Sequence, residues 1–75
     1  MELYDYIEKN PDKVGGEPLF KNTRVPVRIM YEYLEAGDSL DRFLEHYPSV
    51  NSAQARSVLE LTKQKILNSH SQDAA

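Results

Sequence analysis

Hydrophobic residues from position 26 onward recur at the three- and four-residue spacing of amphipathic helices. The first predicted helix spans residues 26–36 and ends at Gly37, because glycine is a common helix stop. Pro26 suits its first position, since proline has a helical φ and no N–H group to leave unpaired there. The apolar side of this helix is expected to contain Ile29, Met30, Tyr33 and Leu34.

A second, shorter helix of about two turns is predicted between residues 39 and 47. Ser39 or Asp38 caps its start, and Pro48 ends it because the residue before a proline avoids helical geometry. Its inward stripe consists of Leu40, Phe43, Leu44 and Tyr47.

The third predicted helix has the clearest start signal in the chain. Asn51 is the cap, and Gln54 is placed to complete a capping box. Leu61 and Leu67 widen the apolar surface, which makes either a broader core contact or a dimer face. The inward stripe is expected to be Ala55, Val58, Leu59, Thr62 and Ile66.

The residues before position 26 have no helical periodicity and predict a β arm. Phe20 and Val25 flank Asn22, which tolerates the positive φ of a tight turn, so we expect a short hairpin. A strand around residues 6–8 would support it, from the same chain or from a second subunit. The predicted fold class is mostly α with a short β-hairpin: a three-helix helix-turn-helix module preceded by an N-terminal β arm.

The length of 75 residues allows one small domain, predicted to span residues 1–68 with a disordered tail at 69–75. Below about 80 residues a single core is seldom sufficient, so small domains add disulfides, a metal or a partner subunit. Cysteine is absent, and His46 and His70 have no ligand cluster near them. A homodimer without metal or cofactor is the expected form.

The absence of cysteine suits the cytoplasm, which is the expected location. No apolar run approaches the ~20 residues of a membrane span, and the first residues lack the basic and apolar regions of a signal peptide. No membrane contact is therefore expected. We also expect no enzymatic activity, because the sequence offers no nucleophile with a base and no phosphate-binding glycine loop.

Charge alternates along the chain around a net value of −3. Residues 29–47 hold one arginine against five acids, and residues 51–68 hold three basic residues against one acid. A negative total disfavours bulk coating of nucleic acid, so any contact with double-stranded DNA must concentrate a few cations.

The candidate DNA-binding residues come from the hairpin region and the start of the third helix. Lys21, Arg24 and Arg28 would extend as a basic arm toward phosphates or a minor groove. The alternative for Arg24 is an ion pair with Glu17 or Asp41 that holds the hairpin against the helices. The third helix would either present a solvated face or point its first turns at base edges; the residues of those turns are Ser52, Gln54, Arg56 and Ser57.

The stretch from Gly15 to Val27 reads Gly-Gly-Glu-Pro-Leu-Phe-Lys-Asn-Thr-Arg-Val-Pro-Val and is followed by Ala36-Gly37, Ser39 and Tyr47-Pro48. With its Gly-x-Pro and Thr-Arg-x-Pro-Val core, the chain resembles, over about residues 7–61, the small bacterial family called domain of unknown function 433. That family usually has glycine where this chain has Asn22. The resemblance implies a homeodomain-like fold, often dimeric, similar to the antitoxins of toxin–antitoxin pairs and found beside a PIN-type nuclease toxin.

The leading hypothesis is an antitoxin-like, DNA-binding transcriptional regulator that acts as a homodimer and neutralises a PIN-type toxin. The acidic residues 32–45 would cover a cationic nuclease surface. The rival hypothesis is a protein-binding adaptor that dimerises and binds no DNA.

Overall fold

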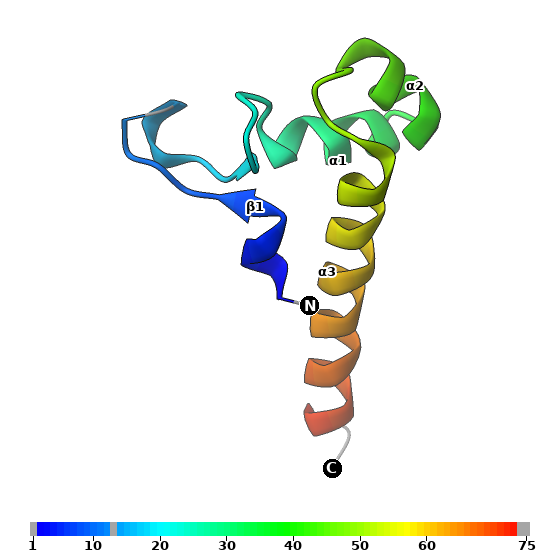
Figure 1. Ribbon diagram of the computed structural model, residues 1–75. Coiled ribbons are helices and arrows are strands. Elements are labelled where there is room, and N and C mark those ends of the chain that lie inside the picture. Colours follow the sequence, from blue (N-terminus) through cyan, green and yellow to red (C-terminus); the bar gives the residue numbers. More distant parts are fainter. Residues whose placement is uncertain (1, 13, 74–75) are drawn as a thin grey trace.

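The computed structural model describes residues 2–12 and 14–73, over which three α-helices follow a β arm (Figure 1). The predicted fold class, mostly α with an N-terminal β arm, is confirmed. None of the described helices combines the length and the apolar content needed to cross a bilayer. The elements in chain order are η1 (Leu3–Asp5), β1 (Ile7–Glu8), η2 (Val14–Gly16), β2 (Leu19–Phe20), α1 (Val27–Glu35), α2 (Leu40–His46) and α3 (Ser52–Asp73).

The β arm is a two-stranded antiparallel sheet in which Ile7 lies opposite Phe20. The supporting strand predicted around residues 6–8 thus pairs within the same chain. On the other edge of β2, Leu19 is bridged to Pro26, and the Phe20 N–H donates to the Val25 carbonyl at 2.9 Å. The expected second hairpin strand is reduced to this bridge, because Pro26 has no N–H to donate.

The turn after β2 is built by Asn22 and Thr23. Asn22 has φ 66°, the left-handed conformation expected from the sequence. The buried Thr23 hydroxyl donates to the Phe20 carbonyl at 2.7 Å and accepts from the Val25 N–H at 3.0 Å. The Thr23 hydroxyl is therefore the acceptor for the Val25 N–H, which in a longer hairpin would donate to the opposite strand.

The first two helices begin and end close to the predicted residues. Pro26 lies one position earlier than expected, as the extended N-cap residue of α1. Gly37, at φ 89°, ends α1, and the Asp38 N–H returns to the Tyr33 carbonyl at 2.9 Å. Of the two expected caps of α2, Ser39 is the one used, since its Oγ accepts from the Arg42 N–H at 3.1 Å.

The third helix is capped by Asn51, whose Oδ1 accepts from the Gln54 N–H at 2.7 Å. The other half of the predicted capping box is wrong, because the Gln54 side chain bonds elsewhere. Helical structure continues to Asp73, five residues beyond the predicted end at residue 68. Residues 74 and 75 of the expected tail lie outside the described residues.

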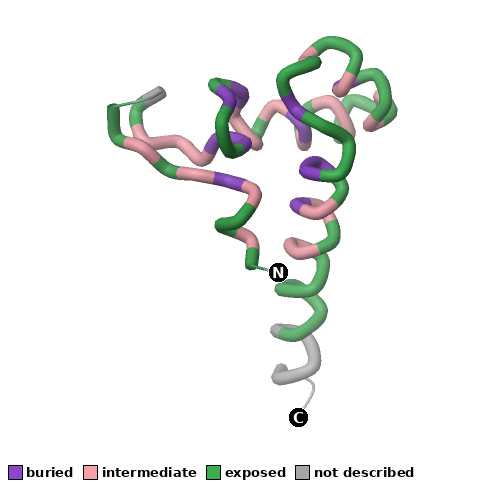
Figure 2. Tube along the Cα trace, viewed as in Figure 1, coloured by how far each residue is buried: buried purple, intermediate pink, exposed green. Residues whose placement is uncertain are grey.

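The core lies where the β arm, α1, α2 and the first turns of α3 meet, and the later turns of α3 run past it (Figure 2). Ile66 was expected in the inward stripe, but its side chain is 69% exposed. The stripe prediction fails there because the body of the protein ends near Thr62, whose Oγ1 lies 2.9 Å from the Tyr31 hydroxyl. The buried hydrophobic residues are Ile7, Leu19, Phe20, Val25, Met30, Phe43, Val50, Ala55 and Val58.

Candidate functional site

The loop after β2 holds two of the predicted cationic residues at the surface. Lys21 donates from Nζ to the Tyr4 carbonyl at 3.3 Å and remains exposed. Arg24 is also exposed and makes no hydrogen bond or ion pair with any described residue. The alternative ion pair of Arg24 with Glu17 or Asp41 is therefore wrong, and those two acids pair with other arginines.

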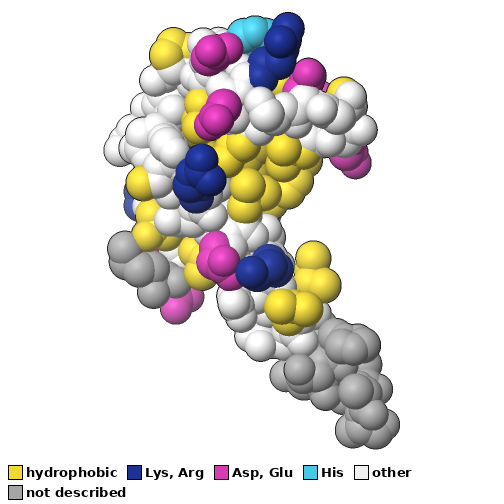
Figure 3. Space-filling model, turned by 90° about the vertical axis from the view of Figure 1, so that its right-hand side faces the viewer, with side chains coloured by type: hydrophobic (Ala, Val, Ile, Leu, Met, Phe, Trp, Pro, Cys, Tyr) yellow, Lys and Arg dark blue, Asp and Glu magenta, His cyan; other side chains and the backbone are white. Residues whose placement is uncertain are grey.

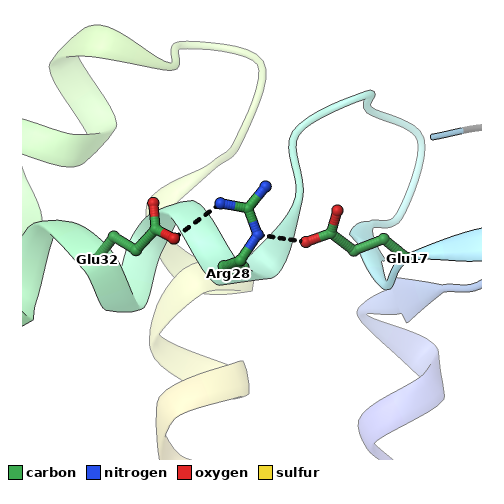
Figure 4. A network of polar contacts seen from close by, with 3 residues as sticks. All are labelled: Glu17, Arg28 and Glu32. Carbon is green, nitrogen blue, oxygen red and sulfur yellow. Dashed lines mark hydrogen bonds and ion pairs between the residues drawn. The ribbon is translucent and has the colours of Figure 1, made fainter. Parts of the chain in front are cut away.

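Arg28 is held between two carboxylates, as Figure 4 shows. Its Nε lies 2.6 Å from Glu17 Oε1, and its Nη1 lies 2.7 Å from Glu32 Oε2. The hydrogen bond to Glu17 and then that to Glu32 raise the pKa of Arg28 above its ordinary value. Phosphate binding by Arg28 would have to displace these two partners, so its clearest role is to tie the segment before β2 to α1.

Gln54 was predicted to contact bases, but its side chain is only 8% exposed. Its Nε2 donates to the Tyr6 carbonyl at 3.0 Å and to the Lys21 carbonyl at 3.1 Å, which uses both amide hydrogens. The residue therefore fastens the β arm to α3 and is withdrawn from the candidate DNA surface. The burial of Gln54 could have been predicted from the sequence, because Gln54 lies four residues before Val58 and therefore on the same side of the helix as this buried residue.

The remaining candidates on α3 are exposed in part. Arg56 donates from Nε to Ser52 Oγ at 3.1 Å, and its Nη2 lies 3.8 Å from Asp41 Oδ1 on α2. Ser57 is half-buried in a small pocket of about 180 Å³ that it shares with Tyr6. Of the four predicted residues, Ser52 and Arg56 are exposed and contact each other, Ser57 is half-buried, and Gln54 is buried.

An open cleft of about 400 Å³ separates the β arm from the first turn of α3. Its charged lining residues, Lys21 and Asp5, have opposite signs, so the cleft selects neither anions nor cations by charge. The full lining is Asp5, Tyr6, Lys21, Asn22, Ser49, Asn51, Ala53 and Gln54.

The protruding end of α3 carries exposed apolar residues. Ile66 is 69% exposed and Leu67 is 49% exposed, whereas Leu61 is half-buried beside Tyr6. Of the two alternatives for the wider apolar surface, Leu61 thus fits the core contact, whereas Leu67 is outside the core and the dimer face stays a prediction. We call Lys63, Ile66 and Leu67 the distal face of α3, because their three- and four-residue spacing puts them on one side of the helix.

The distal face adjoins a shallow groove of about 310 Å³, and Lys63 belongs to both. The residues that line the groove are Arg56, Leu59, Glu60 and Lys63. In Figure 3 a hydrophobic surface is hollowed between the upper part of the molecule, formed by α1 and α2, and α3 below it. We call this groove and the adjoining hydrophobic surface the hollow. The groove itself is mostly charged, because Leu59 is the one apolar residue of the four that line it.

Comparison with known families matches residues 7–61 to the family described as "Protein of unknown function (DUF433)". The chain belongs to the DUF433 family. It is also similar to the "Uncharacterized protein y4eO" of Sinorhizobium fredii (strain NBRC 101917 / NGR234), with 36% identity over 52 residues. This alignment covers 69% of the chain and 24% of that protein, so the chain spans about a quarter of the length of this curated relative. No solved structure matches the chain.

The DUF433 match covers some of the candidate surface residues and not others. It includes Arg24, Arg28 and Arg56 but ends at residue 61. Ile66 and Leu67 lie beyond it. The distal face therefore lies outside the matched region.

Proposed function

We propose that this DUF433 chain is a homodimeric protein-binding module of the antitoxin type and that α3 is the helix by which it binds a second chain. The observation that carries the proposal is the protruding end of α3, where Ile66 and Leu67 are exposed. Burying such side chains against a partner stabilises the complex by about 1.5–3 kcal/mol for each one that is fully covered. A chain this small also gains most from a second subunit.

The antitoxin role extends the proposal to a second kind of partner, a PIN-type nuclease toxin. The resemblance of the motif residues to antitoxin-like proteins supports this partner. Charge supports it too, since Glu35 on α1 and Glu45 on α2 are exposed and form no ion pair with any described residue. Uncompensated carboxylates of this kind attract a cationic nuclease surface.

The experiment that tests self-association is sedimentation equilibrium of Ile66→Lys against wild type. We expect the substitution to raise the dimer dissociation constant at least about tenfold, because a charge replaces a buried apolar contact. Asn68→Lys is the matched control, since it adds the same charge on the other side of α3 and leaves the distal face intact. A wild-type monomer, or equal dissociation constants for the two variants, would refute the proposal.

DNA binding is the second candidate function, supported by the exposed Lys21 and Arg24 and by the helix-turn-helix order of the helices. A salt titration of binding to DNA from the chain's own promoter tests it. We expect affinity to fall steeply with salt and Arg24→Ala to weaken it. Arg42→Ala serves as the control, because Arg42 lies 3.7 Å from Asp38 and outside the candidate set. If the chain binds no DNA at low salt, DNA binding is refuted and protein binding is the proposed function that remains.

A further inference from the structure

We infer that the cleft between the β arm and the first turn of α3 binds one unpaired base of a single-stranded nucleic acid, while Lys21 and Arg24 hold the phosphates beside it. This site shares no residue with the distal face, so it is independent of the homodimer proposed above. It also differs from a site for duplex DNA, because a duplex keeps its bases paired and stacked, where a recessed cleft cannot take them.

The first argument is the chemistry of the cleft. Its volume of about 400 Å³ is that of a small-molecule site, and the charges of Lys21 and Asp5 balance each other. A balanced cleft favours a neutral group that carries both donors and acceptors, and a nucleobase is such a group. The neutral polar side chains that line the cleft are Asn22, Ser49, Asn51 and Gln54.

Three of these four side chains keep hydrogen-bonding capacity for a base. Gln54 uses both amide hydrogens on backbone carbonyls, whereas Asn51 uses only Oδ1, which accepts from the Gln54 N–H at 2.7 Å. The Asn51 Nδ2 group and the side chains of Asn22 and Ser49 make no hydrogen bond with any described residue. Amide and hydroxyl groups of this kind pair with the edges of bases.

The second argument is the turn at the edge of the cleft, where two cations are exposed. Arg24 has no hydrogen bond or ion pair with any described residue, and among the same residues Lys21 Nζ donates only to the Tyr4 carbonyl, at 3.3 Å. Both side chains can therefore take phosphate oxygens without losing an ion pair. The turn is also fixed beforehand, since the Asn22 N–H donates to Glu8 Oε1 at 3.2 Å, so binding has little ordering cost there.

The third argument is an exposed aromatic side chain next to these cations. The Tyr4 side chain is 59% exposed, the Tyr4 carbonyl accepts from Lys21 Nζ, and the next residue, Asp5, lines the cleft. Exposed aromatic residues beside cations are typical of single-strand binding, because bases stack on the rings while the cations follow the phosphates. A base that neighbours the one in the cleft would stack on Tyr4.

The start of α3 offers a duplex few groups that could read a base edge. Gln54 is buried, and Arg56 donates to Ser52 Oγ and lies 3.8 Å from Asp41 Oδ1. The unused hydrogen-bonding groups lie in the cleft instead, and a base has to leave the stack to reach them.

Fluorescence anisotropy at low salt tests the inference with a labelled DNA strand of about ten nucleotides and mixed sequence. The same strand annealed to its complement is the duplex probe, and RNA of the same sequence shows which kind of strand the site accepts. The better of the two single strands should bind at least about fivefold more tightly than the duplex.

The salt dependence of this binding counts the phosphate contacts. Each contact to a single strand contributes about −0.7 to the slope of log affinity against log salt, so Lys21 and Arg24 together predict about −1.4. Arg24→Ala should reduce the slope to about −0.7. Arg42→Ala is the matched control and should leave the slope unchanged, because Arg42 lies 3.7 Å from Asp38 and away from the cleft lining.

Asn51→Asp tests the cleft itself and keeps the cap of α3. An aspartate oxygen still accepts from the Gln54 N–H, but the Nδ2 donor is lost and a negative charge enters the cleft. The affinity for the single strand should fall at least about tenfold, with circular dichroism as the check on folding. Asn68→Asp is the matched control, because it adds the same charge in the later turns of α3.

The possible failures have different meanings. Equal affinities for single strand and duplex would overturn the inference and keep duplex DNA as a candidate ligand. Unchanged affinity in Asn51→Asp would remove the cleft from the binding site and overturn the inference as well. If neither DNA nor RNA binds at low salt, the inference and the DNA-binding candidate are both refuted, whereas the homodimer is judged by its own experiment.

Discussion

Replacement of Gln54 by alanine tests how the β arm is attached to the helices. The side chain is 8% exposed, and its Nε2 donates to the carbonyls of Tyr6 and Lys21 at 3.0 and 3.1 Å. Gln54→Ala removes both hydrogen bonds and leaves a void between β1 and α3. The Tyr6 carbonyl keeps its bond from the Lys21 N–H at 2.9 Å, so only the Lys21 carbonyl loses its described partner.

The expected loss of stability follows from these contacts. Two hydrogen bonds contribute about 0.5–1.5 kcal/mol each, which gives about 2 kcal/mol for Gln54→Ala before the void is counted. For a domain of this size, 1 kcal/mol corresponds to roughly 4–8 °C, so the midpoint of thermal unfolding should fall by about 8–16 °C. The measurement is thermal and urea unfolding at one fixed protein concentration, because the proposed dimer would make the measured stability depend on concentration.

Gln64→Ala is the control for Gln54→Ala. It removes the same side chain from the same helix, where Gln64 is exposed and donates to Glu60 Oε2 at 3.0 Å. Gln64→Ala should change the free energy of unfolding by no more than about 0.5 kcal/mol. Gln54→Glu should destabilise further at neutral pH, where a carboxylate would face two carbonyl oxygens. Equal unfolding midpoints for the two alanine variants would refute the assignment of Gln54 as the attachment of the β arm.

Three further predictions concern the turn and the surface of α3. Thr23→Val should cost about 1–3 kcal/mol in urea unfolding, because it leaves the Val25 N–H without an acceptor; an equal loss in Thr23→Ser would contradict this. Asn22→Gly should match or exceed wild type in thermal stability, while Asn22→Ala should cost about 1 kcal/mol at φ 66°. In an NMR titration the pKa of Glu60 should lie below its ordinary 4.5, chiefly because Gln64 bonds to it, and should rise in Gln64→Ala. The stability that Glu60 adds should be present above its unfolded pKa and vanish as pH falls through its folded pKa; an unshifted Glu60 would count against the bond.

The helix ends were predictable because the signals that set them are local. Ser39, Gly37 and Asn51 each act on backbone groups within five residues, so their roles follow from residue type and spacing. The left-handed Asn22 was predictable for the same reason. The family resemblance also rested on glycine, proline and capping residues that act locally, and it is confirmed by the match over residues 7–61.

The long-range partners of polar residues were not predictable from spacing. Glu17 was expected near Arg24, yet it pairs with Arg28, because the Leu19–Pro26 bridge sets which arginine faces the segment before β2. The helical period correctly placed Ile66 in line with the inward stripe. The period cannot reveal where the body beneath a helix ends, and for that reason the exposure of Ile66 emerged only from the fold.

The molecular mass of the wild-type chain in solution decides whether the proposed homodimer exists. Sedimentation equilibrium across the micromolar range should give a species of twice the 8.6 kDa chain mass, with dissociation only on dilution. A single 8.6 kDa species at every concentration would mean that the exposed end of α3 binds no second copy, and the account of this protein as a homodimer would be wrong.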